Sequence, residues 1–560
     1  MPSRKHPRRA SLLGAALICA CLFAASSQAA PGAGAKPSAE RRVALFYTAE
    51  VHGTVEPCGC TSDPLGDVSR LAGVLADARR AGTSVALVDA GGLLYPEGSL
   101  SAKERPSADL RADFLAGVFD HLGLIGAGLG ETDLSGGLAH LKPARLASNI
   151  TGAGAALAAP TVHKVGDVAV GVLGVADPAL AAPLKGKAED ATAAAQRDVA
   201  ALRKAGAEIV VLLAPIERTQ ARKLARESGA DVVVVGKRVG HGQPRLERVG
   251  RAFLVAPEDE LQRIGRLDIV VRSPATPGAP LELTEAGGVE ANRLRREEIT
   301  RSLERLRGAL ANWGTAGAAG GSSDGDFVAS KKREVKELEA EFSQLSAPWQ
   351  PPATGNYVVN ALVPLHRRLR RDPALVAKMK ALDKAIAAVN LRQATPPPAA
   401  EPGRATYVGM DRCASCHKSA MTFWKHTVHA HAWKTLVDGG KQADYKCVSC
   451  HVTGFGQVGG SSLGFTKKLE SVQCETCHGP GSLHVAGEGN EEPLAIKRDT
   501  PETVCLTCHT EQHSDTFVYD AYLRDIVGPG HGGKRRDALG AGKTGHELRS
   551  AALARAKSIH

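Results

Sequence analysis

The stretch Cys413-Ala-Ser-Cys416-His417 is the first of four boxes with one pattern: two cysteines stand three positions apart and a histidine follows at once. Such a box is typical of c-type haem attachment, because two thiols reach the vinyl groups of one porphyrin and the adjacent histidine binds its iron. We number the boxes 1 to 4 in chain order; boxes 2 to 4 are Cys447-Val-Ser-Cys450-His451, Cys474-Glu-Thr-Cys477-His478 and Cys505-Leu-Thr-Cys508-His509. The sequence therefore predicts four covalently bound haems, with proximal iron ligands His417, His451, His478 and His509.

Zinc is the main alternative for these cysteines. Cys447 and Cys450 with Cys474 and Cys477 have the spacing of a zinc ribbon. Zinc does not require a histidine directly after every second cysteine, and all four boxes have one. Structural disulfides fail for the same reason. The pattern favours haem.

The spacing of the boxes indicates how the haems are used. The boxes begin at residues 413, 447, 474 and 505, which leaves little chain between them for an apolar core. We therefore expect the haems to pack against one another and to exchange electrons rapidly. A second histidine on the far side of an iron makes a six-coordinate electron carrier, whereas an open face can bind a small molecule. Six further histidines are available for that second place: His426, His429, His431, His484, His513 and His531.

Three stretches of this region resemble the tetrahaem cytochrome family that accepts electrons from hydroxylamine oxidoreductase. They are Tyr407-Val-Gly409, Trp424-Lys-His-Thr-Val-His429-Ala-His431-Ala and Cys477-His478-Gly479-Pro-Gly-Ser-Leu-His484. The resemblance implies that His429 and His484 are distal ligands; His513 and His531 follow as candidates on position alone. Because the family includes members with one open haem, catalysis at a haem stays an alternative to pure electron transfer.

The N-terminal half has the pattern of an α/β domain. Short apolar runs at 43–47, 84–89, 168–174, 209–213 and 231–235 alternate with segments of helical periodicity such as 67–81. Continuous runs of Val, Ile and Leu predict strands that are covered on both faces. We expect this domain to span residues 41–275, with its last strand near 267–271.

Motifs in this domain resemble the metallophosphatase domain of the 5'-nucleotidase family, which folds as a layered α/β sandwich around two metal ions. They are Tyr47-Thr-Ala-Glu50-Val-His52-Gly53, Asp89-Ala-Gly91-Gly92 and Gly128-Leu-Gly-Glu-Thr-Asp133. Glu50 and His52 are the residual metal-ligand candidates.

The departures from the family pattern concern the metal ligands themselves. Gly92 stands where a metal-bridging Asp belongs, Leu129 and Gly130 replace Asn and His, Pro215 replaces a His, and Lys237 lies in the last ligand motif. A two-metal hydrolase needs carboxylate and imidazole ligands around both cations. We therefore expect a degenerate scaffold, with a surviving phosphoesterase as the alternative.

Cys58 and Cys60 lie in the loop after the first of these motifs. A metal site, a haem ligand and a strained disulfide are all compatible with this spacing.

Residues 288–392 are expected to form a helical connector. Charged helical patterns at 291–313 and 327–345 flank a Gly/Ser/Ala loop, so an antiparallel hairpin is expected, either as a spacer or as a partner-binding arm. A short strand at 357–363 and a helix at 372–390 follow. We place a Pro/Ala linker at 393–405, the haem domain, mostly helical or irregular, at 406–533 and a basic tail at 534–560.

The first 29 residues have the pattern of a signal peptide, with a basic start, an apolar run at 11–26 and Ser27-Gln28-Ala29 at the cleavage position. The apolar run is shorter than the ~20 residues that a membrane span needs. A lipoprotein box ending at Cys21 is a second interpretation. Either way we expect a periplasmic location, which suits c-type haem attachment.

The formal net charge of +11 does not indicate nucleic-acid binding. Two propionates per haem would add roughly −8 for four haems. We therefore predict an exported tetrahaem cytochrome that carries electrons in periplasmic respiration between redox partners. The alternatives are an oxidoreductase with one open haem, acting on a small nitrogen or sulfur compound, and a metal-dependent phosphoesterase.

Overall fold

The structure is a computed structural model that describes residues 40–57, 59–237, 242, 245–273, 276–316, 322–490 and 496–559. The expected signal peptide with Cys21, and Cys58 of the loop pair, lie outside these residues. No helix in the described ranges is long and apolar enough to cross a membrane. We call residues 40–392 the front domain and residues 406–559 the haem region.

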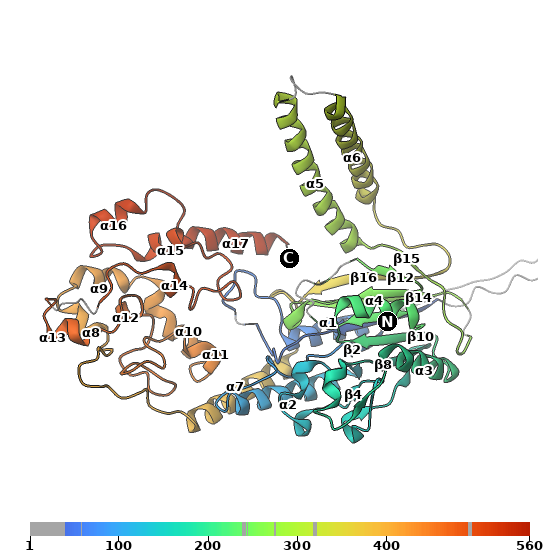
Figure 1. The fold of residues 1–560 in the computed structure, drawn as a ribbon, viewed down its shortest axis with the longest axis horizontal. Coiled ribbons are helices and arrows are strands. Elements are labelled where there is room, and N and C mark those ends of the chain that lie inside the picture. The colour runs from blue at the N-terminus through green and yellow to red at the C-terminus, as the bar shows by residue number, and fades with distance from the viewer. Residues whose placement is uncertain are drawn as a thin grey trace, which may run out of the picture. The chain divides into compact units, whose positions relative to one another are not determined.

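The front domain is built on two six-stranded sheets (Figure 1). The first has the order β15-β16-β14-β1-β2-β3, and the second β12-β13-β11-β10-β8-β7. The strands of the first sheet are β1 (Arg41–Thr48), β2 (Ser84–Asp89), β3 (Leu124–Ala127), β14 (Arg263–Val271), β15 (Leu283–Glu285) and β16 (Asn356–Pro364). Those of the second are β7 (Thr161–Val165), β8 (Val168–Gly174), β10 (Ile209–Ala214), β11 (Val232–Val235), β12 (Glu247–Val249) and β13 (Ala252–Val255). The front domain also contains two short two-stranded sheets. One pairs β4 (Arg145–Leu146) with β6 (Leu157–Ala158), and the other pairs β5 (Ile150–Thr151) with β9 (Lys187–Ala188).

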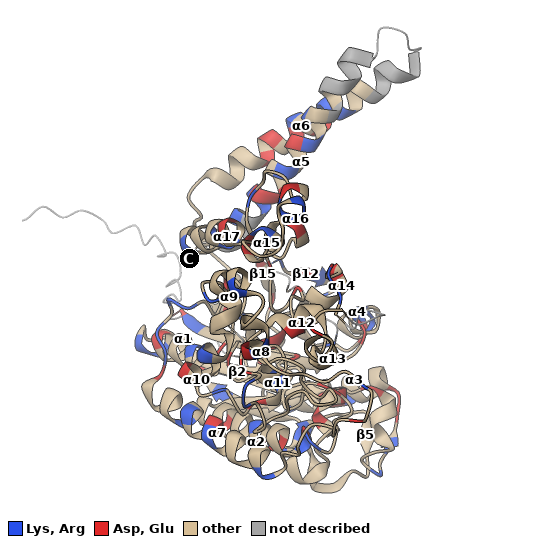
Figure 2. Ribbon diagram, turned by 90° about the vertical axis from the view of Figure 1, so that its left-hand side faces the viewer, with Lys and Arg blue, Asp and Glu red and all other residues tan. Residues whose placement is uncertain are grey.

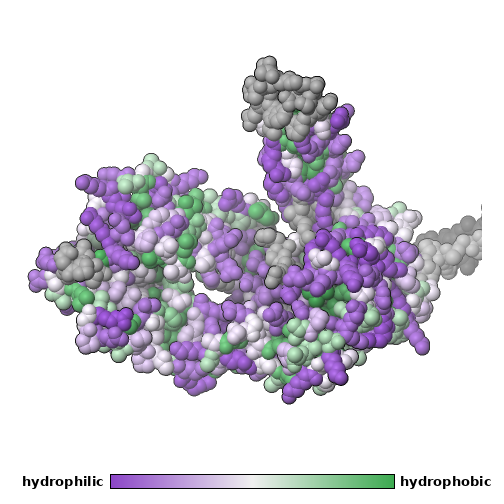
Figure 3. Space-filling view, viewed as in Figure 1, coloured by the Kyte–Doolittle hydropathy of each residue, from purple (hydrophilic) through white to green (hydrophobic). Residues whose placement is uncertain are grey.

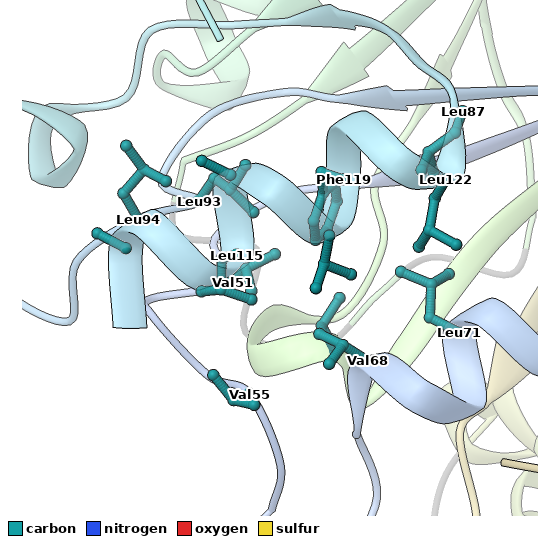
Figure 4. Packing of buried hydrophobic residues seen from close by; sticks show 14 of the residues in the cluster. Val51, Val55, Val68, Leu71, Leu87, Leu93, Leu94, Leu115, Phe119 and Leu122 are labelled. Carbon is teal, nitrogen blue, oxygen red and sulfur yellow. The ribbon is translucent and has the colours of Figure 1, made fainter. Parts of the chain in front are cut away.

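The two sheets pack face to face between helices, which makes the layered α/β sandwich expected from the sequence. Apolar side chains of both sheets fill the space between them, as Leu45 of β1 and Val211 of β10 do. Helices α1 (Val68–Arg80), α2 (Arg105–Leu122) and α7 (Pro373–Arg392) cover the first sheet, and α3 (Ala191–Lys204) with α4 (Arg218–Glu227) covers the second. Figure 4 shows Phe119 and Leu122 of α2 pointing toward Val68 and Leu71 of α1.

Local chemistry explains where these helices begin and end. The Asp67 carboxylate accepts a hydrogen bond from the Ser69 amide and caps α1. Asp190 and Asp372 cap α3 and α7 in the same way, and Pro373 occupies the first turn of α7. Gly123, in the left-handed region at φ 83°, ends α2. Each of these helices therefore carries its own start or stop signal.

The expected domain boundaries differ from the structure. We expected the α/β domain to end at residue 275, but β15 and β16 join its first sheet, where β16 pairs antiparallel with β14 from Arg263↔Pro364 to Val270↔Tyr357. Helix α7 then packs against α2 and contributes Leu375 and Met379 to the same core. Pairing between strands so far apart in the chain leaves no local pattern in the sequence. The strand at 357–363 could therefore be predicted, but the strand with which it pairs could not.

Between β15 and β16 the chain forms the expected hairpin of α5 (Val289–Ala316) and α6 (Ser322–Ser346). Figure 2 shows basic and acidic residues interspersed along both helices, and Figure 3 shows hydrophilic residues over much of their described surface. Ion pairs join the helices, including Arg295 with Glu341 at 2.7 Å and Arg307 with Glu339 at 2.6 Å. Charge pairing of this kind suits a helix pair that stands in solvent.

The haem region consists of short helices and irregular chain. They are α8 (Met410–Ala414), α9 (Lys418–Trp424), α10 (Ala432–Gly439), α11 (Tyr445–Val448), α12 (Cys474–His478), α13 (Ser482–Ala486), α14 (Glu502–Cys505), α15 (Tyr519–Ile526), α16 (Gly533–Ala538) and α17 (Gly545–Ile559). Its apolar cluster is small: in the described part of the chain its buried members are Val448, Val452 and Leu463. The expected basic tail is helical, and α17 packs against α15. Such a region has too little apolar side chain to form a core by itself, which agrees with large planar cofactors serving as its core.

Candidate haem-binding site

Each box begins on or beside a short helix that presents its cysteines. Boxes 1 to 4 fall on α8, α11, α12 and α14, respectively. The His417 amide donates to the Cys413 carbonyl at 2.9 Å, and the His509 amide donates to the Cys505 carbonyl at 2.8 Å. One helical turn thus brings the histidine back under the first cysteine, as attachment to a single porphyrin requires.

Three of the four proximal candidates face a second imidazole. His417 lies opposite His484, with ring centres 6.2 Å apart and planes inclined by 23°. His478 lies opposite His531 at 6.5 Å and 27°. His509 of box 4 lies 6.2 Å from His429, which stands on the 3-10 turn Val428–His431, with planes inclined by 48°.

These separations fit an iron ion between the rings. Two metal–nitrogen bonds of about 2 Å, plus about 1 Å from each nitrogen to its ring centre, span about 6 Å. Burial and the neighbouring His509 lower the pKa of His429 to about 4, so His429 is neutral near pH 7, the form that binds metal. The residues therefore fit c-type haem with two axial histidines at boxes 1, 3 and 4.

The ring nitrogens not needed for iron have partners of their own. The Nδ1 atoms of His451 and His478 lie 2.6 Å from the Ala432 carbonyl and 2.7 Å from the Lys497 carbonyl. The Nδ1 atom of His509 lies 3.0 Å from the Ser514 hydroxyl. Donation from Nδ1 fixes each ring and leaves Nε2 to bind metal.

Box 2 differs from the other boxes. Among the described residues, no imidazole is paired with His451 at an iron-spanning distance. His513, expected as a distal candidate, is near enough to Cys450 for its charge to act on that thiol, but its Nδ1 atom lies 2.7 Å from the Thr510 hydroxyl. His426 likewise contacts the preceding helix α9, with Nδ1 2.9 Å from the Thr422 carbonyl.

The boxes also approach one another in pairs. The thiol of Cys413 in box 1 lies close enough to that of Cys474 in box 3 for the two to shift each other's pKa, and the thiols of Cys450 in box 2 and Cys508 in box 4 do the same. Cofactors attached at such neighbouring positions would lie in close contact. Two close pairs of boxes in one small region provide the arrangement that electron exchange between haems needs.

A buried carboxylate that the sequence interpretation overlooked connects boxes 1 and 3. Glu475, inside box 3, is only 2% exposed and accepts hydrogen bonds from the amides of Val408 at 3.0 Å, Gly409 at 2.8 Å and Gly481 at 2.7 Å. The signal was available: the first residue between the cysteines is Ala, Val or Leu in the other boxes and an acid only here. Neighbouring Gln473 donates to two carbonyls and accepts from the amide of Met410.

The residual metal-ligand candidates of the front domain pair with each other. Nε2 of His52 lies 3.1 Å from a Glu50 carboxylate oxygen, and both residues have left-handed backbone, at φ 53° and 50°. Burial lowers the pKa of His52, but Glu50, Asp259 and Glu260 raise it, and the net effect is a raised pKa. No group of three or more His, Cys, Asp or Glu side chains in the described ranges could hold a metal ion together.

Backbone fills the space where further metal ligands would be needed. A β-carbon at Gly92 would lie 2.7 Å from a Glu50 carboxylate oxygen, and one at Gly130 would lie 2.2 Å from the Gly92 amide nitrogen. At Gly236 it would lie 2.6 Å from the Ala90 carbonyl oxygen. The loops at the carboxyl ends of the strands have closed on one another, so these residues do not fit a two-metal centre.

The second metallophosphatase-like motif, which begins at Asp89, has a structural role. Asp89 is fully buried and accepts hydrogen bonds from the Thr48 hydroxyl at 2.7 Å and the Gly91 amide at 2.9 Å. Burial raises the pKa of Asp89 to about 7 despite these bonds. Lys237 approaches Asp177 at 3.3 Å.

The comparisons with known proteins agree with the haem geometry. The family model for cytochrome c554 and c-prime matches residues 412–479, which contain boxes 1 to 3. Cytochrome c-554 of Nitrosomonas europaea is 40% identical over 115 residues, which are 18% of this chain and 48% of that protein. The chain thus spans about half the length of this curated relative. The reduced cytochrome c554 structure from that organism shows 26% identity over 22% of this chain and 83% of its own, with a TM-score of 0.18.

Structural neighbours also include a 5'-nucleotidase and a thiohydrolase. The 5'-nucleotidase precursor of Thermus thermophilus is 14% identical, covers 72% of this chain and 68% of its own, and has a TM-score of 0.40. The sulfate thiohydrolase SoxB of Thermus thermophilus is 17% identical over 40% of this chain and 53% of its own, at 0.34. The family model and the curated relative confirm the first resemblance stated from the sequence: the C-terminal region of the chain is similar to the cytochrome c554 family. The front domain has the α/β layers that its sequence resemblance to the metallophosphatases predicted.

Proposed function

We propose that this protein is an exported tetrahaem c-type cytochrome that carries single electrons in periplasmic respiration. The observation that carries the proposal is the set of three imidazole pairs, each joining a box histidine to a second histidine across a gap that fits one iron. When bound, the haems supply the redox chemistry, and the protein sets their potentials through axial ligands and burial.

Under this proposal the histidines of the haem region would act as proximal and distal iron ligands. His417 and His484, His478 and His531, and His509 and His429 would serve as axial pairs at boxes 1, 3 and 4. His451 would be the proximal ligand at box 2, and His513 has no support from ring geometry as its partner. The carbonyls and the hydroxyl at Nδ1 of the proximal rings would hold those rings in the orientation that iron binding needs.

A second candidate function is favoured by box 2, where no imidazole among the described residues is paired with His451. A haem at box 2 with an open face could bind a small nitrogen or sulfur compound, and the other three haems would then deliver or remove electrons. The protein would be an oxidoreductase in that case.

A carbon monoxide difference spectrum of the reduced, haem-loaded protein separates the two. Carbon monoxide binds ferrous haem only where an axial position is open or weakly held. A haem count of four per chain, without a response to carbon monoxide, supports the pure electron carrier. A response of one haem in four supports the oxidoreductase. Fewer than four haems per chain would contradict the tetrahaem assignment.

The front domain would position the haem region for its redox partners. The closed backbone at Gly92 and Gly130 argues against a divalent metal and against the phosphoesterase alternative. Turnover of a generic phosphate ester with added manganese would contradict this view. Export would depend on the signal at 1–29, with a lipid anchor at Cys21 as the alternative form; mass spectrometry of the mature N-terminus distinguishes them.

A further inference from the structure

The segment that leads into box 2 is held by side chains of the front domain. Arg111 on α2 pairs with Asp444 at 2.6 Å, and the two side chains are only 12% and 10% exposed. Asp444 is also the N-cap of α11, where its other carboxylate oxygen accepts the Lys446 amide at 3.1 Å. The helix of box 2 thus begins at a carboxylate that pairs with an arginine from a distant part of the sequence.

Three further contacts hold the residues just before Asp444. Lys441 binds Glu56 at 2.6 Å, in the loop after the first metallophosphatase-like motif, and also Asp383 of α7. Asn390, fully buried near the end of α7, donates to the Ala443 carbonyl at 2.9 Å. Side chains from one loop and two helices therefore converge on the short segment from Lys441 to Asp444.

Few bonds separate the segment from Lys441 to Asp444 from the attachment cysteines of box 2. The amides of Cys447 and Val448 donate to the Asp444 carbonyl, each at 3.0 Å, so Asp444 sets the direction of α11. Cys447 is the first attachment residue of box 2, three positions after Asp444. A half-buried ion pair is specific in geometry, and removing one partner leaves an uncompensated charge at low exposure.

We infer that the front domain is a built-in clamp that orients the haem of box 2 and sets its potential, with Arg111 as the positioning residue that acts through Asp444. The inference rests on the proposed function in requiring a haem on Cys447 and Cys450. It gives the degenerate domain a role directed at the one box whose proximal histidine faces no imidazole in the described part of the chain. Loss of Arg111 would remove one of the positive charges near Asp444 and leave Lys446 as a nearby cation. Because Asp444 lies three residues before Cys447, the environment of a haem at box 2 would become more negative, which favours the ferric state.

The test uses the full-length, haem-loaded protein and spectroelectrochemical titration of all its haems. For Arg111→Ala, the reduction equilibrium of one haem is expected to fall on the order of tenfold, while the other three stay unchanged. Arg111→Lys keeps the charge and should restore most of the loss. Arg111→Ala combined with Asp444→Asn removes both charges, which is tolerated better than removing one, and should also return that haem toward its original potential. Arg105→Ala is the matched control, because Arg105 lies on the same helix and pairs with Asp109 of that helix.

The outcomes of this test distinguish failure of the clamp from failure of the proposed cytochrome function. Four haems per chain, with none or all of their potentials shifted equally in Arg111→Ala, would overturn the clamp and leave the cytochrome intact. Wild-type protein with no haem on Cys447 and Cys450, by peptide mass spectrometry, would overturn the tetrahaem function and the clamp together. A shift confined to one haem and reversed by the two rescue variants would establish the clamp.

Discussion

Replacing His531 by alanine should open one haem and only one. His531 faces His478 of box 3 across 6.5 Å, and the two planes are inclined by 27°. An alanine side chain cannot reach an iron at half that separation. The box 3 haem would then lose its sixth ligand and accept carbon monoxide in the ferrous state.

The expected magnitude follows from the stoichiometry of the site. Under the proposed assignment each imidazole pair would hold one iron, so the carbon monoxide amplitude should rise by one haem equivalent, a quarter of the total if four haems are bound. The increase is counted from the wild-type amplitude, whether that is zero or already one equivalent at box 2. The assay is a titrated carbon monoxide difference spectrum, normalised to haem content by the pyridine haemochrome method.

The matched control is His426→Ala. His426 is exposed, contacts the Thr422 carbonyl of the preceding helix α9 and faces no other imidazole among the described residues, so its removal should leave the amplitude unchanged. Equal amplitudes in wild type and His531→Ala, at full haem loading, would refute the axial assignment. An equal rise in both variants would show that the signal reports general loosening instead of ligand loss.

Three further predictions concern buried groups. Glu475→Ala removes the acceptor for three amides and should cost roughly 3 kcal/mol or more in urea unfolding followed at the Soret band, whereas exposed Glu470→Ala should cost less than about 0.5 kcal/mol; similar midpoints would contradict the role of Glu475. The pKa of Asp89 in the folded protein is raised to about 7, so its contribution to stability is present below about pH 4 and is lost as the pH rises to 7. Asp89→Asn should therefore flatten the decline in unfolding free energy between about pH 4 and 7. An unchanged slope would contradict this prediction. Gly92→Asp, which restores the family residue, should lower the melting temperature by several degrees without creating manganese binding in calorimetry, since its β-carbon meets Glu50 at φ 75°.

Local patterns explain what the sequence could predict. Seven strands of the two sheets were visible as apolar runs, and the first of them, expected at 43–47, lies within β1. The shorter strands β3, β7, β12, β13 and β15 were not predicted. The boxes were visible because thioether attachment needs a fixed spacing. In both cases the physics acts over a few neighbouring residues, so the sequence contains the whole signal.

Features that depend on distant residues were less accessible. The domain boundary at 275 missed β16, because its pairing with β14 is set by the sheet and not by its own residues. Among the distal candidates, ring geometry supports His429, His484 and His531 but not His513, which, like His531, was a candidate on position alone. The role of Glu475 depends on amides 66 and 67 residues earlier in the chain.

The loss of metal ligands raises the question of what now holds the loops at the carboxyl ends of β2 and β3. Asp133 provides one answer: it is fully buried and accepts the amides of Gly92 at 3.0 Å and Gly130 at 2.9 Å, as well as those of two leucines. Arg145, also fully buried, lies 3.2 Å from the same carboxylate. A guanidinium therefore balances this charge without a metal ion, and several charge-assisted bonds tie two loops to one residue.

A scaffold locked in this way can serve as a rigid support. Arg111 and Glu56, which hold the segment before box 2, come from α2 and from the loop after β1, both of which pack on the same core as these closed loops. A surface that positions a haem must stay fixed when the haem changes its charge, because movement of the surrounding charges would change its reduction potential. The close packing of these loops would thus supply the stiffness that the proposed clamp requires, and it rests on the tightly packed glycines and the buried Asp133 carboxylate.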